Sequence, residues 1–159
     1  MTQAVALDLD GVLGDTRPLW RDWLEDAERR FRSIAPLAAA ALPDDRGAAA
    51  EALDRWAGNG GGDWRALLER FAEERAPLYL RTRPDVGAAL RRLAAAGIRL
   101  GAFTDAPEPL ARVALGQLGA ARRLEALEAG ADALARLLAR LGPDAVVVRS
   151  PDGLLAVDP

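Results

Sequence analysis

Ala6-Leu7-Asp8-Leu9-Asp10-Gly11-Val12-Leu13-Gly14-Asp15-Thr16 is the stretch of sequence that decides the fold. An apolar run that begins at Ala4 leads into it, which predicts a strand ending at Asp8 and a glycine-containing loop that holds Asp10. Two carboxylates at this spacing can converge on one polar spot beside an open backbone. One of them can then act as nucleophile or metal ligand, and its neighbour as acid and base.

The composition excludes several kinds of catalytic site. The chain of 159 residues suits one domain, or a compact core with a small insertion, and its 50% hydrophobic content suffices for a core. It has no histidine, cysteine or lysine, so all 21 basic residues are arginine. Histidine-based triads, imidazole or thiolate metal sites, Schiff-base lysines and cysteine nucleophiles are therefore excluded.

Charge and hydropathy narrow the range of partners and compartments. The net charge of −3 and the pI near 5.1 argue against nucleic acid as a main partner. No apolar run approaches the roughly 20 residues of a membrane span, and the N-terminus lacks the layout of a secretory signal. Together with the absence of cysteine, these features favour a cytoplasmic protein without a membrane partner.

Residues 17–80 predict an all-helical insertion after the aspartate loop. Apolar residues recur at helical spacing in the first part of this region, and glycines 58–62 interrupt its second half. The expected pieces are a helix at 17–34, an alanine-rich piece at 35–42, a helix at 47–56 and a helix from Asp63 through Glu74.

From residue 83 onward, helices and strands are expected to alternate. This order predicts an α/β fold with a Rossmann-like parallel sheet, whose sites lie at the carboxyl ends of its strands. The core would comprise residues 1–16 and 81–159, with residues 17–80 as a helical cap over the site. The expected elements are helices at 84–96, from Pro107 or Pro109 to Gly119, and at 131–141, with strands at 98–103, within 123–127 and at 145–148.

The segment from Asp8 to Thr16 resembles the first motif of the haloacid dehalogenase-like (HAD) phosphatase superfamily, Asp-x-Asp-Gly-Val/Thr-Leu-x-Asp-Thr. The resemblance, to the capped phosphoglycolate-phosphatase-like type, implies that Asp8 is the nucleophile that takes the phosphoryl group. It implies that Asp10 is the acid and base. The family's second motif, a serine or threonine that ends the next core strand, resembles Thr104-Asp105. These two residues would bind phosphate together with the start of the following helix.

The chain departs from the family's third and fourth motifs. The third is a lysine, which this chain lacks, and Arg149 is the best-placed substitute, with Arg122 or Arg123 behind it. The fourth is a Gly-Asp pair with further acids that hold Mg²⁺. Here only Asp152 is nearby, so the resemblance implies a metal site of Asp8, Asp10 (through its backbone carbonyl) and Asp152. Residues 151–153 equally predict an ordinary turn, such as that of a terminal hairpin.

Three functions remain open from the sequence. The first is a Mg²⁺-dependent hydrolase that acts on a small phosphorylated metabolite through an aspartyl-phosphate intermediate. The second is a catalytically impaired member of the family that binds a phosphorylated ligand, a protein partner or a second copy of itself. The third, a structural helical protein, leaves the aspartate loop unexplained. The intact first motif favours hydrolysis.

Overall fold

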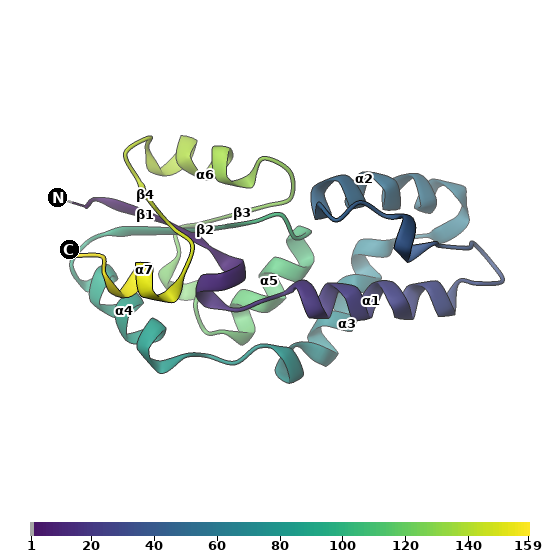
Figure 1. The fold of residues 1–159 in the computed structure, drawn as a ribbon, viewed down its shortest axis with the longest axis horizontal. Coiled ribbons are helices and arrows are strands. Elements are labelled where there is room, and N and C mark those ends of the chain that lie inside the picture. Colours follow the sequence, from purple (N-terminus) through teal and green to yellow (C-terminus); the bar gives the residue numbers. More distant parts are fainter. Residues whose placement is uncertain (1) are drawn as a thin grey trace.

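A computed structural model describes residues 2–159 and contains a four-stranded parallel sheet with the strand order β3-β2-β1-β4 (Figure 1). β1 lies between β2 and β4 and is buried along most of its length. The predicted α/β, Rossmann-like fold is thereby confirmed. The strands are Ala4–Asp8 (β1), Arg99–Thr104 (β2), Ala126–Ala129 (β3) and Val146–Val148 (β4).

Helices cover both faces of this sheet. α6 (Ala133–Leu141) lies on one face, and α4 (Pro84–Ala95), α5 (Glu108–Gln117) and α7 (Pro151–Leu155) lie on the other (Figure 1). A short turn, η4 (Ala121–Arg123), leads into β3. This layered arrangement explains why the strands read as continuous apolar runs, since both faces of a parallel sheet are buried.

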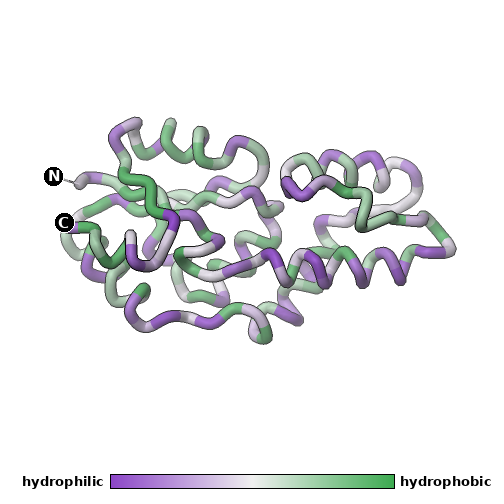
Figure 2. Tube along the Cα trace, in the orientation of Figure 1, coloured by the Kyte–Doolittle hydropathy of each residue, from purple (hydrophilic) through white to green (hydrophobic). Residues whose placement is uncertain are grey.

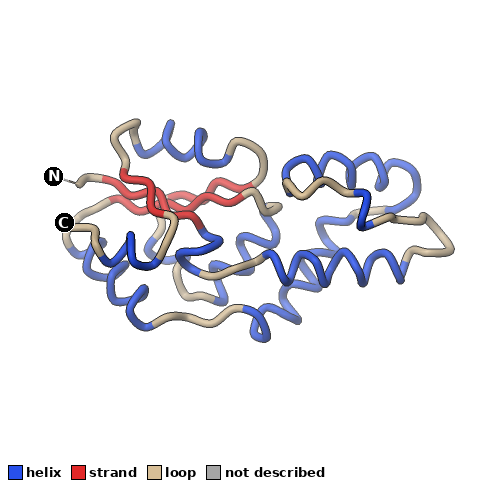
Figure 3. The backbone as a smooth tube through the Cα atoms, viewed as in Figure 1, coloured by secondary structure: helices blue, strands red, loops and turns tan. Residues whose placement is uncertain are grey.

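Residues 17–80, here called the helical insertion, contain only helices and loops and lie beyond the carboxyl end of β1 (Figure 3). Hydrophilic and hydrophobic residues alternate along its first helix (Figure 2), which buries one face and exposes the other. Its elements are α1 (Arg17–Arg30), η2 (Ala39–Ala41), α2 (Arg46–Trp56), η3 (Ala57–Gly61) and α3 (Trp64–Tyr79).

Two hydrophobic clusters hold the molecule together. The larger one runs continuously from the α4, α5 and α7 side of the sheet into the helical insertion. The smaller one joins α6 to the sheet, where Leu137 is fully buried. A Cβ at Gly101 would lie only 2.6 Å from Leu137 Cδ1, so a glycine here lets α6 approach β2 closely.

Some predicted elements differ from the observed ones. α3 continues to Tyr79, and the alanine-rich piece at 35–42 forms only the short turn η2. The terminal hairpin is wrong, because residues 151–155 form the helix α7. The Ser150 side chain caps this helix by accepting a hydrogen bond from the Gly153 N–H at 3.1 Å. Leu154, a residue of the helix itself, is fully buried.

Within residues 2–159, no helix combines the length and the apolar character that crossing a bilayer requires.

Candidate functional site

The register of the sheet brings the predicted site residues to one edge. Asp8 pairs with Phe103 on β2, so Thr104 is the next residue along that edge. Leu7 pairs with Val148 on β4, so Arg149 lies beside Asp8. Carboxyl ends of parallel strands are where ligands bind in open α/β sheets.

A tight loop returns Asp10 toward this edge. The turn η1 (Leu9–Leu13) is closed by hydrogen bonds from the Gly11 N–H to the Gly14 carbonyl (2.8 Å) and from the Gly14 N–H to the Leu9 carbonyl (3.1 Å). Gly11 has a φ of +112°, and a Cβ there would lie 3.1 Å from the Arg149 carbonyl oxygen. Only glycine meets both demands without strain, which explains why a glycine directly follows Asp10.

Asp10 is held by hydrogen bonds on both of its carboxylate oxygens. Oδ1 accepts hydrogen bonds from the Thr16 N–H and hydroxyl, each at 2.7 Å. Oδ2 accepts one from the Thr104 hydroxyl at 2.7 Å and one from Arg46 Nη2 at 2.5 Å. The two threonines are themselves buried, so this carboxylate lies in a closed polar cluster.

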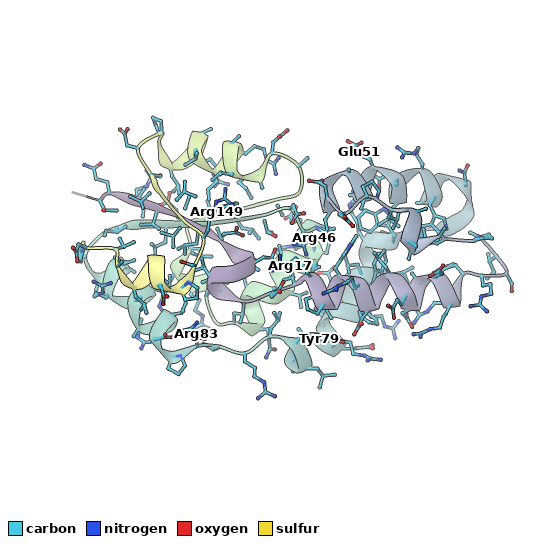
Figure 4. All side chains as sticks on the ribbon, in the orientation of Figure 1. Arg17, Arg46, Glu51, Tyr79, Arg83 and Arg149 are labelled. Atoms are coloured by element: carbon cyan, nitrogen blue, oxygen red, sulfur yellow. The ribbon has the colours of Figure 1, made fainter. Side chains whose placement is uncertain are left out.

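Arg46 enters this cluster from the first turn of α2, at the junction of the helical insertion and the core (Figure 4). Besides Asp10, its guanidinium donates to the Thr16 hydroxyl at 2.7 Å and to Asp105 Oδ1 from Nε (3.1 Å) and Nη2 (2.8 Å). Its backbone N–H also donates to Asp105 Oδ2 at 3.1 Å. The side chain is only 3% exposed, so Arg46 is a buried cation shared between two carboxylates.

Asp8 has a different environment. Its Oδ2 accepts a hydrogen bond from Arg149 Nη1 at 3.2 Å, and the Arg149 guanidinium also lies over the Phe103 ring at 5.2 Å. Partial burial, and then the charge of Asp10, raise the pKa of Asp8 above its usual value, although Arg149 acts in the opposite direction. Because Arg149 is 61% exposed, water screens its charge more than it screens that of Arg46.

The carboxylate of Asp105 is committed to Arg46. Burial alone would raise the pKa of Asp105, but the hydrogen bonds and charge of Arg46 outweigh burial and lower it. The sequence predicts that Asp105 binds phosphate. In the structure, its side chain is hydrogen-bonded to the Arg46 guanidinium instead.

Two cavities adjoin Asp105. One, of about 620 Å³, is lined by Asp8, Thr104, Asp105 and Arg149 and is bounded by apolar residues of α6. The other, of about 550 Å³, lies against the helical insertion and is lined by Arg46 and Asp105. Asp105 lines both, whereas Arg46 lines only the second. Asp8 is thus open to a ligand-sized space, whereas Asp10 is covered.

The predicted metal site of Asp8, Asp10 and Asp152 is not assembled here. Among residues 2–159, no three acidic side chains lie close enough together to hold an ion. Asp152 lies in the first turn of α7, where its charge acts on Arg83. Both side-chain oxygens of Asp10 are already hydrogen-bonded, so its backbone carbonyl is the oxygen of Asp10 that is left to hold Mg²⁺ beside Asp8.

Comparisons with known proteins identify the family of the chain. The model of the haloacid dehalogenase-like hydrolases matches residues 2–148. The chain belongs to this family. None of the curated proteins compared with the chain matches it.

Solved structures of family members share the fold at low sequence identity. CbbY from Rhodobacter sphaeroides, in complex with phosphate, is 22% identical, with a TM-score of 0.61 over 97% of this chain and 83% of that one. A putative β-phosphoglucomutase from Thermotoga maritima is 20% identical (TM-score 0.57; 92% and 75% covered). A HAD phosphatase from Thermococcus onnurineus is 19% identical (TM-score 0.54; 99% and 83% covered).

The structure shows which arginines reach the site. Arg149 lies beside Asp8, as the sequence predicts. Arg122 and Arg123 lie in η4, which precedes β3, and Arg123 donates to the Gly119 carbonyl at 3.3 Å instead. Arg46 was missed. It is one of 21 arginines, and the one signal in the sequence was its place after Asp45, the N-cap of a helix in the insertion.

Proposed function

We propose that this chain is a phosphomonoester hydrolase that works through an aspartyl-phosphate intermediate formed on Asp8. The observation that supports this most is the place of Asp8, at the end of the central strand and on the wall of the 620 Å³ cavity beside Thr104 and Arg149. A carboxylate in such a position can attack a phosphorus atom held by a hydroxyl and a guanidinium. Membership of the HAD-like hydrolases supports the same chemistry.

The reaction has two steps. A carboxylate oxygen of Asp8 forms a bond to phosphorus while the bond from phosphorus to the leaving alcohol oxygen breaks, and Asp10 gives that oxygen its proton. Water then attacks the phosphorus and loses its proton to Asp10, and the bond from Asp8 to phosphorus breaks, which releases inorganic phosphate. Asp10 accepts four hydrogen bonds in this arrangement and must exchange at least one of them to reach the leaving oxygen.

Thr104 and Arg149 bind the transferred group in this proposal. The Thr104 hydroxyl turns its one proton from Asp10 to a phosphoryl oxygen, and the Arg149 guanidinium compensates part of the charge that phosphate adds beside Asp8. We assign the Asp105 side chain to holding Arg46 rather than to phosphate, because carboxylate and phosphate repel each other. CbbY was solved with phosphate and with xylulose-(1,5)bisphosphate, which makes a small phosphorylated metabolite the expected substrate class.

Hydrolysis of p-nitrophenyl phosphate by the wild type and by Asp8→Asn tests the proposal. Activity should fall to background in Asp8→Asn and stay unchanged in Asp144→Asn, which alters an exposed carboxylate of the core outside the site. Equal background rates from the wild type and Asp8→Asn would instead favour an impaired family member that only binds its ligand.

Two further comparisons address the cation and the metal. Arg149→Ala should lower kcat/KM more than Arg122→Ala, because only Arg149 contacts Asp8. Equal small effects would refute the role of Arg149. Family members generally use Mg²⁺, so the assay is run with Mg²⁺ and with a chelator. Activity that requires Mg²⁺ would show that the site rearranges to complete a donor set.

A further inference from the structure

The family's lysine is missing from the core, yet the site contains a buried positive charge. Arg46 is 3% exposed and contacts Asp10 and Asp105, whereas Arg149, the cation of the core, is 61% exposed. Coulomb interactions are stronger where water is excluded, so Arg46 compensates the carboxylates more effectively than Arg149 does. The positive charge that water screens least therefore comes from the helical insertion.

We propose that Arg46 is a positioning residue that supplies this positive charge only while the first turn of α2 is seated on the core. This inference rests on the proposed function of the same site. Before Asp10 takes up the proton that it gives to the leaving oxygen, Asp8, Asp10 and Asp105 face two guanidiniums when α2 is seated, which leaves a formal charge of −1. Without Arg46 the formal charge is −2, and an entering phosphate dianion meets a second uncompensated carboxylate.

The packing of the first turn of α2 against the core brings Arg46 close to the carboxylates. Gly47 packs against the loop between β3 and α6, where a Cβ would lie 3.1 Å from the Ala131 backbone nitrogen and 3.2 Å from its Cα. The neighbouring Asp45 caps the helix by accepting a hydrogen bond from the Ala48 N–H at 2.8 Å. The backbone of Ala131 cannot rotate away, which leaves little room for a larger side chain, so seating depends on Gly47.

Arg46 also fixes the orientation of Asp10. With Arg46 and Thr104 on Oδ2 and Thr16 on Oδ1, the carboxylate is held inside the cluster. Arg46 lines only the cavity against the insertion, whereas Asp105 lines both cavities. Exchange of one of the hydrogen bonds that Asp10 accepts frees Asp10 to meet the leaving oxygen, while Arg46 acts on the entering phosphate through its charge.

Two variants separate the charge of Arg46 from the packing of α2 against the core. Arg46→Ala removes the guanidinium, and Gly47→Val keeps every charge but obstructs the close approach of α2 to Ala131. Both should lower kcat for p-nitrophenyl phosphate by about 10²- to 10³-fold, the usual effect of removing one charged donor from such a site. Arg70→Ala, which removes an 82% exposed arginine of the same insertion, should change nothing.

Rescue distinguishes a charge role from a purely structural one. Added guanidinium should restore part of kcat in Arg46→Ala, because the deleted group leaves a space of its own shape, and it should not affect Arg70→Ala. Arg46→Gln, which keeps hydrogen-bond donors without the charge, replaces the alanine variant if that variant does not fold. Full activity in Gly47→Val, or an Arg46→Ala loss that guanidinium leaves unchanged, would overturn the proposal.

Binding of inorganic phosphate decides the inference even if the proposed hydrolysis fails. Measured by calorimetry, Kd should rise at least about tenfold in both Arg46→Ala and Gly47→Val and stay constant in Arg70→Ala, since the loss of one nearby unit of positive charge is worth about that much. If the wild type and Asp8→Asn hydrolyse equally, the hydrolase proposal is wrong, while this binding series still tests Arg46. Unchanged phosphate binding in all three variants would refute the role of Arg46.

Discussion

Asp105→Asn isolates the ion pair that joins the helical insertion to the core. Asp105 accepts hydrogen bonds from the Arg46 side chain at 2.8 and 3.1 Å and from the Arg46 backbone at 3.1 Å. An asparagine is of nearly the same size but lacks the charge. Hydrogen bonds to charged groups are worth about 1.5–3 kcal/mol. Because the Asp105 side chain is 43% exposed and partly screened, we expect a loss of about 1–2 kcal/mol.

The pH dependence of this loss provides the sharper test. The pKa of Asp105 is lowered in the folded state, so the pair contributes stability above the ordinary pKa of 3.8 and loses it as pH falls through the lowered value. Thermal unfolding at pH 7 should show a Tm lower by roughly 2–8 °C in Asp105→Asn. The difference from the wild type should shrink as the pH is lowered below 3.8. A Tm difference of the same size at pH 7 and below pH 3.8, or no difference at pH 7, would refute the reasoning.

Two further predictions concern the core and the nucleophile. Leu137→Ala, which empties a fully buried position between α6 and the sheet, should lower the free energy of unfolding by about 2–5 kcal/mol, measured by urea unfolding. A loss under about 1 kcal/mol would mean that α6 repacks against Gly101. Asp8→Asn should be more stable than the wild type at pH 7, because a raised pKa means that ionised Asp8 destabilises the folded state. That advantage should shrink as the pH falls through the raised pKa and be gone by about pH 3.8, and a variant less stable at pH 7 would contradict it.

Local patterns were enough to predict the sheet edge of the site. Asp8, Thr104 and Arg149 each follow an apolar run, and parallel strands bring their carboxyl ends together whatever the details of packing. The two-residue spacing of Asp8 and Asp10, followed by Gly11, likewise predicted the turn after β1. These features depend on neighbours along the chain or on the sheet, which a sequence pattern captures.

Arg46 could not be found in this way. Its contacts join residues 30 to 59 positions apart, and they depend on how α2 seats on the core. Burial of a single arginine among 21 leaves no periodic trace in the sequence. The terminal helix was missed for a related reason, because Ser150-Pro151-Asp152-Gly153 suits a turn as well as a helix start. The burial of Leu154 against the rest of the fold settled the choice.

The tryptophans are distributed unevenly along the chain. All four, Trp20, Trp23, Trp56 and Trp64, belong to the helical insertion, where three of them form a chain of rings with centroids 5.4 and 6.0 Å apart. The Trp56 indole N–H donates to the Ala35 carbonyl, which anchors the fourth. Intrinsic tryptophan fluorescence is therefore a built-in optical label for one part of the molecule. Titrated with phosphate or denaturant, it reports on the insertion alone, while circular dichroism reports on the whole.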